Sequence, residues 1–406
     1  MTVEFEHGGP IDKIRTVTYI GAGMMGCVNS LVAAVSGYSV VLHDASADVL
    51  ATATARQEGV GAYMVGIGYC TPEALAAGLG RVTRTPELGD ALAGADLVSE
   101  SIYEDRETKR SVFRQVDELA APDTIITTNT STLMVSDLED AVERGDCFAA
   151  LHSHLGAPLY DIVGGPRTST ETINTLRRFV ESLGGTPMVL RKEHPGYVFN
   201  SMNGQVMRVA VQLVLDRRAT VEDVDRAWMT ARSAPMGPFA MMDLFGLDLM
   251  LDSWSAPATD AHNKALRERV VPFLTEFVEA GHLGQKSGSG FYNYPEPAYQ
   301  QPGFAEAEPP SQSASDALLG ALITAALTIE INGVADRADI DATWCAATGQ
   351  IVGPFGILER LGVDVFIAIL DELRATRLVT AEIADAVRPH LVGGSLRSEP
   401  STRCTR

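Results

Sequence analysis

The chain of 406 residues has little cysteine and little lysine, and these shortages exclude several classes of protein. Its five cysteines are scattered and form no CxxC pair, so cysteine spacing indicates neither a disulfide framework nor a zinc site. Only five residues are lysine, and the formal net charge of −20 argues against nucleic acid or an anionic membrane surface as a partner. No apolar run is long enough to span a bilayer, and the first ten residues lack the apolar core of a signal peptide. We therefore expect a soluble, cytoplasmic protein that binds no metal.

The N-terminal half alternates short apolar runs with helical stretches. Strands are expected at 14–20, 38–44, 95–99, 124–127, 147–151 and 187–191, and helices at 46–58, 107–120, 134–143 and 170–183. Alternating strands and helices favour a mostly parallel sheet that is covered on both faces. The predicted fold class is therefore α/β, with a doubly wound Rossmann-type domain over residues 1–193.

From residue 194 onward the pattern indicates helices only, and part of it is repeated. Residues 223–248 align without a gap with residues 339–364, at an offset of 116, and share identities that include Trp and Gly-Pro-Phe. Chance similarity of helical composition is the alternative to a repeat. We predict an all-α region with two helical domains, at 194–295 and 314–395, the second a degenerate copy. A proline-rich linker at 293–313 joins them, and the tail after Gly393 is expected to be disordered.

The motif GAGMMG between the first strand and the first helix predicts a phosphate-binding turn. Its first glycine permits the tight turn, its second lets the backbone approach a pyrophosphate, and its third lets helix and strand pack closely. An acid at the end of the second strand accepts hydrogen bonds from a ribose 2′-hydroxyl and repels a 2′-phosphate, so NAD is expected rather than NADP. The predicted cofactor-binding residues here are Gly21, Gly23, Met24, Met25, Gly26 and Asp44.

Several further motifs occur in one order and point to one family. They are SESIYEDRETK at 99–109, NTSTL at 129–133, a strand containing Leu-His at 151–163, HPGYVFN at 194–200, APMGPF at 234–239 and GQKSGSGFYNY at 284–294. With GAGMMG, they make residues 12–295 resemble the 3-hydroxyacyl-CoA dehydrogenases. The resemblance implies an NAD-dependent oxidation of a 3-hydroxy thioester. The second helical copy resembles the tandem C-terminal domains of multifunctional members, which implies either a homodimer or a pseudo-dimeric monomer.

The resemblance also implies roles for single residues. Glu104 and Lys109 match positions near the nicotinamide ribose, and Asn129 matches a position beside the nicotinamide. Ser131, His152 and Asn200 match the substrate side. The chemistry agrees with this assignment, because a histidine can take the hydroxyl proton while Ser and Asn donors hold the substrate oxygen.

Two departures from the family pattern complicate the substrate and the mechanism. The family's glutamate, twelve residues after the histidine, falls on Gly164, and strand alternation places Asp161 on the opposite face from that position. His154 shares the face of His152, so it is either a substitute base, a substrate ligand, or a strand histidine satisfied by backbone. In the helical arm at 51–80, Arg56 is the only basic residue, although CoA carries several phosphate charges.

The leading interpretation is an NAD-dependent dehydrogenase of the 3-hydroxyacyl type, with His152 as general base. Its substrate is a small molecule or a thioester carried by CoA or by a carrier protein. Two alternatives stay open at this point. One is a repurposed relative that uses NAD and the same pocket for a non-standard step in specialised metabolism, either redox or non-redox, and the other is a non-catalytic NAD-binding protein.

Overall fold

The computed structural model of the chain describes residues 8–256, 261–306 and 311–392. The backbone divides into two compact units, and each is described by itself. The first comprises the residues up to Val198 together with Gly333–Asp339 and Ala346–Gly349; the second comprises Phe199–Asn332, Ile340–Cys345 and the residues from Gln350. The tail that was predicted to be disordered lies outside the described residues.

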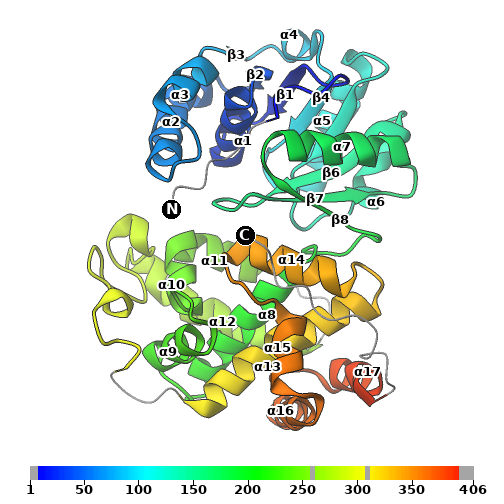
Figure 1. Cartoon of the computed structure of the whole chain (residues 1–406). Coiled ribbons are helices and arrows are strands. Elements are labelled where there is room, and N and C mark those ends of the chain that lie inside the picture. Colours follow the sequence, from blue (N-terminus) through cyan, green and yellow to red (C-terminus); the bar gives the residue numbers. More distant parts are fainter. Residues whose placement is uncertain (1–7, 257–260, 307–310, 393–406) are drawn as a thin grey trace. The chain divides into compact units, whose positions relative to one another are not determined.

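An eight-stranded sheet forms the centre of the first unit (Figure 1). Its strands are β1 (Thr16–Ile20), β2 (Ser39–His43), β3 (Val82–Thr85), β4 (Leu97–Glu100), β5 (Ile125–Thr128), β6 (Phe148–Ser153), β7 (Leu159–Gly164) and β8 (Thr186–Val189). The spatial order is β3-β2-β1-β4-β5-β6-β7-β8, in which β3 through β6 are parallel and β7 runs antiparallel to β6. The first six strands have the doubly wound order of a dinucleotide-binding domain, which confirms the predicted fold class. The segment predicted as one strand at 151–163 is a hairpin of β6 and β7.

Helices of the first unit connect these strands. They are α1 (Met24–Val35), α2 (Ala47–Gly66), α3 (Pro72–Leu79), α4 (Leu88–Leu92), α5 (Arg106–Leu119), α6 (Val135–Leu138) and α7 (Thr170–Ser182), with single 3₁₀ turns η1 (Glu139–Ala141) and η2 (Gly145–Cys147). Polar side chains fix several starts: Asp105 accepts from the Thr108 N–H before α5, and Ser169 accepts from the Thr172 N–H before α7. Strands β1 to β6 run parallel, so their carboxyl ends lie at one edge of the sheet, where loops lead into the helices.

The second unit is built from helices. They are α8 (Phe199–Leu215), α9 (Val221–Arg232), α10 (Pro238–Phe245), α11 (Leu247–Ser255), α12 (Ala261–Glu279), α13 (Gln312–Ile331), α15 (Pro354–Leu361), α16 (Val363–Ala375) and α17 (Ala381–Val392), with 3₁₀ turns η3 (Gln285–Ser287) and η4 (Ala298–Gln300). Helix α14 (Arg337–Thr348) contributes residues to both units. By length and composition α13 could cross a membrane, but 72% of its most apolar window is buried inside the protein, as in the core helix of a globular domain.

The two segments that align at an offset of 116 have the same local structure. Helices α14 and α15 begin and end 116 residues after α9 and α10, and α16 begins 116 residues after α11. In the first segment both Asp225 carboxylate oxygens accept hydrogen bonds from the N–H groups that begin α10, at 2.8 and 2.9 Å. In the second, Asp341 does the same for α15, at 2.8 and 3.1 Å. These aspartates therefore satisfy backbone donors at a helix start, the structural role expected for them.

The segment predicted as a linker packs more closely than its composition suggests. Tyr299 and Phe304 are buried, and the Arg226 guanidinium lies 4.9 Å from the Phe304 ring centroid and donates to the Phe304 carbonyl at 2.9 Å. Two aromatic rings in a proline-rich stretch are enough to hold it against α9. The segment predicted as a linker is therefore packed against α9 at these residues.

Candidate active site

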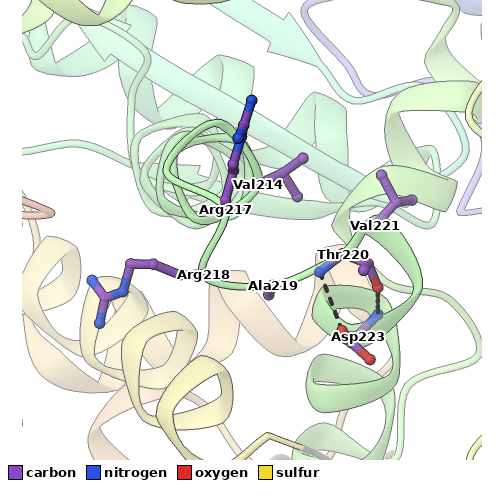
Figure 2. Close-up of a pocket in the computed structure, with 7 residues that line it drawn as sticks. All are labelled: Val214, Arg217, Arg218, Ala219, Thr220, Val221 and Asp223. Carbon is purple, nitrogen blue, oxygen red and sulfur yellow. Dashed lines mark hydrogen bonds between the residues drawn. The ribbon is translucent and has the colours of Figure 1, made fainter.

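The predicted cofactor and substrate residues of the first unit lie at or after the carboxyl ends of neighbouring strands. A pocket in the second unit is a different feature (Figure 2), lined by Val214, Arg217, Arg218, Ala219, Thr220, Val221 and Asp223. There the Thr220 and Asp223 side chains cap the start of α9, and no predicted site residue takes part. Ligands of doubly wound sheets bind at the carboxyl edge. The candidate active site therefore lies at that edge of the first unit.

The glycines of the turn after β1 meet the demands of a nucleotide site. Gly21 has a φ of +98°, and a Cβ there would lie 2.5 Å from the Ser101 carbonyl oxygen. A Cβ on Gly26 would collide with the Gly21 carbonyl, whereas a Cβ on Gly23 would meet nothing within 4 Å. Gly23 precedes α1 without a side-chain cap, and the Met24 side chain is half exposed. The turn thus presents open backbone and a helix N-terminus, which fits a pyrophosphate.

Asp44 and Arg56 both face this turn. The two carboxylate oxygens of Asp44 accept from the Ala22 and Ser46 N–H groups, each at 2.9 Å, so the acid predicted to meet the ribose is fixed beside the glycines. The Arg56 guanidinium donates to the Ala22 carbonyl at 2.7 Å. The only basic residue of the helical arm is therefore engaged at the turn.

Lys109 is enclosed by acids. Its ammonium group lies 2.6 Å from Glu100 and 3.2 Å from Glu104, and its side chain is 1% exposed. One Glu104 oxygen accepts from the Ser131 and Thr132 N–H groups, both at 3.2 Å. Burial alone would raise the pKa of Glu104, but Lys109 and the threonine hydroxyls outweigh it and hold that pKa below its usual value. Lys109 and Glu104 thus fix the loop that carries Ser131.

Asn129 connects the ends of two strands. Its side-chain oxygen accepts from the Ser153 N–H at 2.8 Å and from the Ser153 hydroxyl at 3.2 Å, and its own N–H donates to the Glu100 carbonyl. Asn129 is thereby tied to the last residue of β6, one position after His152. Ser153 was not predicted as a site residue.

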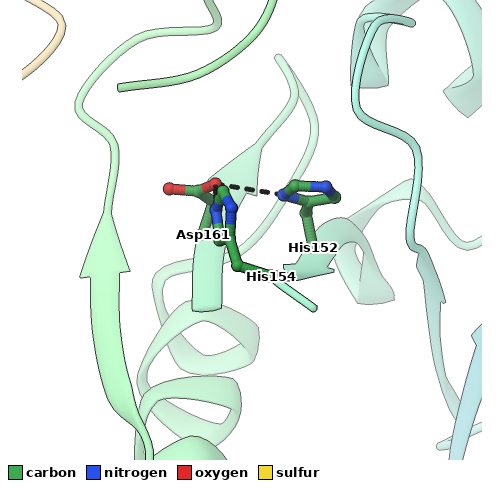
Figure 3. Close-up of side chains that lie close together, drawn as sticks. All are labelled: His152, His154 and Asp161. Carbon is green, nitrogen blue, oxygen red and sulfur yellow. Dashed lines mark hydrogen bonds and ion pairs between the residues drawn. The ribbon is translucent and has the colours of Figure 1, made fainter. Parts of the chain in front are cut away.

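His152 and His154 share one carboxylate (Figure 3). Nδ1 of His152 lies 3.1 Å from Oδ2 of Asp161, and Nε2 of His154 lies 2.7 Å from the same oxygen. Asp161 is fully buried, and the two histidine side chains are 9% and 7% exposed. The rings of the histidines meet edge to face, with centroids 4.5 Å apart. The expectation that these histidines share a face is confirmed.

The interpretation that the orienting carboxylate is lost is wrong. In the β6–β7 ladder His152 pairs with Asp161, and cross-strand partners lie on the same face of a sheet. Gly164 pairs with Ala149, and a Cβ on it would point to Thr168 and Ile173. The carboxylate that meets His152 is Asp161, which lies nine residues after the histidine and opposite it on β7.

Burial and pairing set the charge states of this group. Burial lowers the pKa of His152 below its usual value, and the hydrogen bond that His152 donates to Asp161 only partly opposes this. Burial would raise the pKa of Asp161, but the hydrogen bonds from both histidines outweigh it and hold the pKa low. The arrangement is a neutral imidazole beside an ionised carboxylate, which suits a general base.

Tyr197, from the HPGYVFN motif, is a further residue that the predicted set omits. Its ring centroid lies 5.3 Å from that of His152, and its hydroxyl donates to the Thr130 carbonyl at 2.8 Å. The tyrosine at a φ of +51° thus links the histidine to the Ser131 loop. Asn200 of the same motif is the second residue of α8 and belongs to the second unit, so its place beside His152 stays a prediction.

The helical arm, α2 and α3, is partly a packing element. Met64 joins Leu31 and Val35 of α1 in a buried cluster, while Tyr63 and Ile67 are more than half exposed. Apart from Arg56, the charged residues over 47–80 are three acids, Asp48, Glu58 and Glu73. The arm therefore offers exposed apolar side chains and no cation other than the one at the glycine turn.

Comparison with known families defines the class of protein first. Residues 16–194 match the 3-hydroxyacyl-CoA dehydrogenase NAD-binding domain, and residues 196–294 and 314–392 match the C-terminal domain of the same enzymes. With the nucleotide-binding turn, this identifies an NAD-dependent oxidoreductase of the class that acts on CH–OH groups.

Two curated relatives and one solved structure illustrate the relationship. Human mitochondrial hydroxyacyl-coenzyme A dehydrogenase is 32% identical over 295 residues, covering 69% of this chain and 91% of its own. The 5-formyl-3-hydroxy-2-methylpyridine 4-carboxylate 5-dehydrogenase of Mesorhizobium japonicum is 31% identical over 288 residues, with the same coverage. The structure of 3-hydroxybutyryl-CoA dehydrogenase from Escherichia coli K12 shares the fold over 94% of this chain and 99% of its own, at 22% identity and a TM-score of 0.76. The chain belongs to the 3-hydroxyacyl-CoA dehydrogenase family.

Proposed function

We propose that this chain oxidises a secondary hydroxyl group in a 3-hydroxyacyl compound, and reduces the ketone in reverse, with His152 as general base. The observation that carries the proposal is the buried His152–Asp161 hydrogen bond at the carboxyl edge of an NAD-binding sheet. It removes the main reason for the alternative of a repurposed enzyme, which was the missing family glutamate, and the retained Ser131, His152 and Asn200 argue against a non-catalytic protein.

In the proposed reaction, Asp161 accepts a hydrogen bond from the Nδ1–H group of His152, and this tautomer leaves Nε2 with its lone pair. Nε2 takes the hydroxyl proton of the substrate, and the resulting imidazolium is stabilised by the adjacent carboxylate. When bound, NAD accepts the hydride that leaves the carbinol carbon. Ser131 and Asn200 hold the substrate oxygen, and His154 supports Asp161.

The cofactor roles follow from the fit of the glycine turn. Gly21, Gly23, Gly26 and the methionines at the start of α1 receive the pyrophosphate, and Asp44 receives the adenosine ribose. Glu104, braced by Lys109, and Asn129 set the loop on the nicotinamide side.

We further propose that substrate recognition does not depend on the phosphates of CoA. The arm expected to meet them carries three acids and one arginine, and that arginine is bonded to Ala22. A relative of similar identity is named for a pyridine carboxylate rather than for a CoA thioester. A free hydroxy acid or a carrier-protein thioester is the substrate class that this arm fits.

A matched set of substrates tests both proposals. One 3-hydroxyacyl group is offered as the CoA thioester, as the pantetheine thioester without the nucleotide phosphates, and as the free acid, with NADH formation followed by absorbance. We expect the pantetheine thioester or the acid to match or exceed the CoA thioester in kcat/KM. A strong preference for CoA would overturn the substrate class alone, and no turnover with any member of a chain-length series would overturn the dehydrogenase assignment.

We also propose a domain organisation for the chain. The equal helix bounds, the paired Asp225 and Asp341 caps and the two matches to one C-terminal domain support an internal duplication, with limits at 1–193, 194–295 and 314–395. A cytoplasmic protein, present as a homodimer or as a pseudo-dimeric monomer, follows as a proposal. Light scattering of the full chain separates these two states.

A further inference from the structure

His152, His154 and Asp161 bring three metal-ligating atoms together. Nδ1, Nε2 and Oδ2 of these residues all lie within 4.8 Å of one another. The two histidines are in a His-x-His pattern at the end of β6, so they share a face, and the aspartate faces them from β7. Cysteine spacing gives no sign of such a set, because its members come from two strands.

The distances are close to those that a cation requires. Zinc bonds to imidazole nitrogen and carboxylate oxygen are about 2.0–2.2 Å, so ligand atoms in a tetrahedral site are about 3.4 Å apart. The two histidine nitrogens lie 3.1 and 2.7 Å from the Asp161 oxygen. For a tetrahedral cation, the carboxylate oxygen would move a few tenths of an ångström away from the histidine nitrogens, and the two nitrogens, which lie within 4.8 Å of each other, would come to about 3.4 Å.

The charge of the site also favours a cation. Asp161 is fully buried, and its Oδ1 atom has no hydrogen-bond partner among the described residues. A buried carboxylate is costly unless it is compensated by positive charge, and two neutral imidazoles supply only N–H dipoles. The buried ammonium of Lys109 is already held by Glu100 and Glu104.

We propose that His152, His154 and Asp161 form a site for a divalent transition-metal ion, and that its occupation blocks the dehydrogenase reaction. Two imidazoles and one carboxylate select zinc-like ions over Mg²⁺ and Ca²⁺. A neutral His152 that binds the ion through Nδ1 keeps its single proton on Nε2, so it has no lone pair left for the substrate hydroxyl. The blocking effect rests on the proposed function, whereas the binding does not.

Zn²⁺ and Co²⁺ are the probes for this site, used on the full chain after treatment with a chelator and without NAD or substrate. By calorimetry we expect one Zn²⁺ per chain in the wild type, and at least about tenfold weaker binding in His154→Gln, which removes one ligand. Co²⁺ should give the intense visible absorption of a tetrahedral site in the wild type, a readout that needs no variant. His282→Gln, which removes an exposed histidine of the second unit, is the matched control and should bind as the wild type does.

Inhibition is measured separately with whichever substrate turns over. Zn²⁺ should inhibit the wild type and EDTA should restore its activity. Absence of stoichiometric binding, or equal binding by the wild type and His154→Gln, would overturn the site. Binding without inhibition would overturn the block. A failure of the dehydrogenase proposal would show as no turnover while metal binding persists, so the two failures are distinguishable.

Discussion

Replacing Asp161 by Asn is the most direct test of how the active site works. Asn is nearly isosteric and keeps a hydrogen-bonding group opposite His152, so the β6–β7 hairpin should be retained. It removes the negative charge next to the imidazolium that forms during oxidation. It also offers an N–H to Nδ1, which favours the tautomer that cannot accept the substrate proton at Nε2.

The expected loss of kcat follows from the distance between His152 and Asp161. His152 and Asp161 are 3.1 Å apart at their nearest atoms and both are buried. Two unit charges about 4 Å apart at an effective dielectric constant of 20 attract by about 4 kcal/mol. Each 1.4 kcal/mol is a factor of ten, so we expect kcat to fall by about 10²–10³, the lower end because Asp161 also serves His154.

The assay is steady-state NADH formation by Asp161→Asn and by Asp161→Glu, with NAD affinity from quenching of intrinsic fluorescence. NAD affinity should stay within about threefold of the wild type, because Asp161 is remote from the glycine turn in the fold. Asp161→Glu keeps the charge and should recover part of the rate. A kcat for Asp161→Asn within threefold of the wild type, with NAD binding intact, would refute the assignment of Asp161 as the carboxylate that supports the base.

Three further outcomes are expected. Gly26→Ala places a methyl group on the Gly21 carbonyl, so calorimetry should find NAD affinity reduced at least about tenfold; unchanged affinity would contradict the described turn. Glu104→Gln should lower the free energy of unfolding at pH 7 by about 1–2 kcal/mol, after allowance for partial exposure of the carboxylate. Because the folded-state pKa of Glu104 is lowered, its contribution to stability is present above the unfolded-state pKa near 4.5 and is lost as pH falls through the folded-state pKa. Denaturant titrations should therefore show that the difference in unfolding free energy between the wild type and Glu104→Gln closes in acid. A difference that is independent of pH would count against the pairing with Lys109. Asp225→Ala and Asp341→Ala should each lower the free energy of unfolding in urea by about 2 kcal/mol, because each leaves two N–H groups at a helix start without an acceptor. A loss confined to one of the two variants would show that the two segments are not equivalent.

Local patterns predicted the nucleotide-binding half well. The β1–α1–β2 unit, the glycine turn and Asp44 depend on neighbouring residues and on strand–helix alternation, which the sequence displays directly. The likeness of the two helical segments could also be predicted, because Asp225 and Asp341 each lie fourteen residues before an N–H group that they cap.

The partner of the base was missed for a physical reason. Counting along the chain places the family carboxylate at Gly164, but the hairpin register decides which side chains meet. In the observed register, Asp161 and not Gly164 lies opposite His152. Alternation along β7 correctly places Asp161 and Gly164 on opposite faces of the sheet. It does not say which of these faces carries His152 of β6, because that depends on the register between the two strands. The burial of Lys109 between two acids likewise depends on how α5 packs over β4.

The repeated helices bear on how this chain responds to cofactor concentration. Among the described residues there is one dinucleotide-binding turn but two helical segments with the same bounds and caps. A chain with one nucleotide site binds one NAD and saturates hyperbolically. Sigmoidal saturation would require linkage between sites on different chains. With one such turn per chain, a sigmoidal NAD saturation curve would therefore report coupling between sites on associated chains.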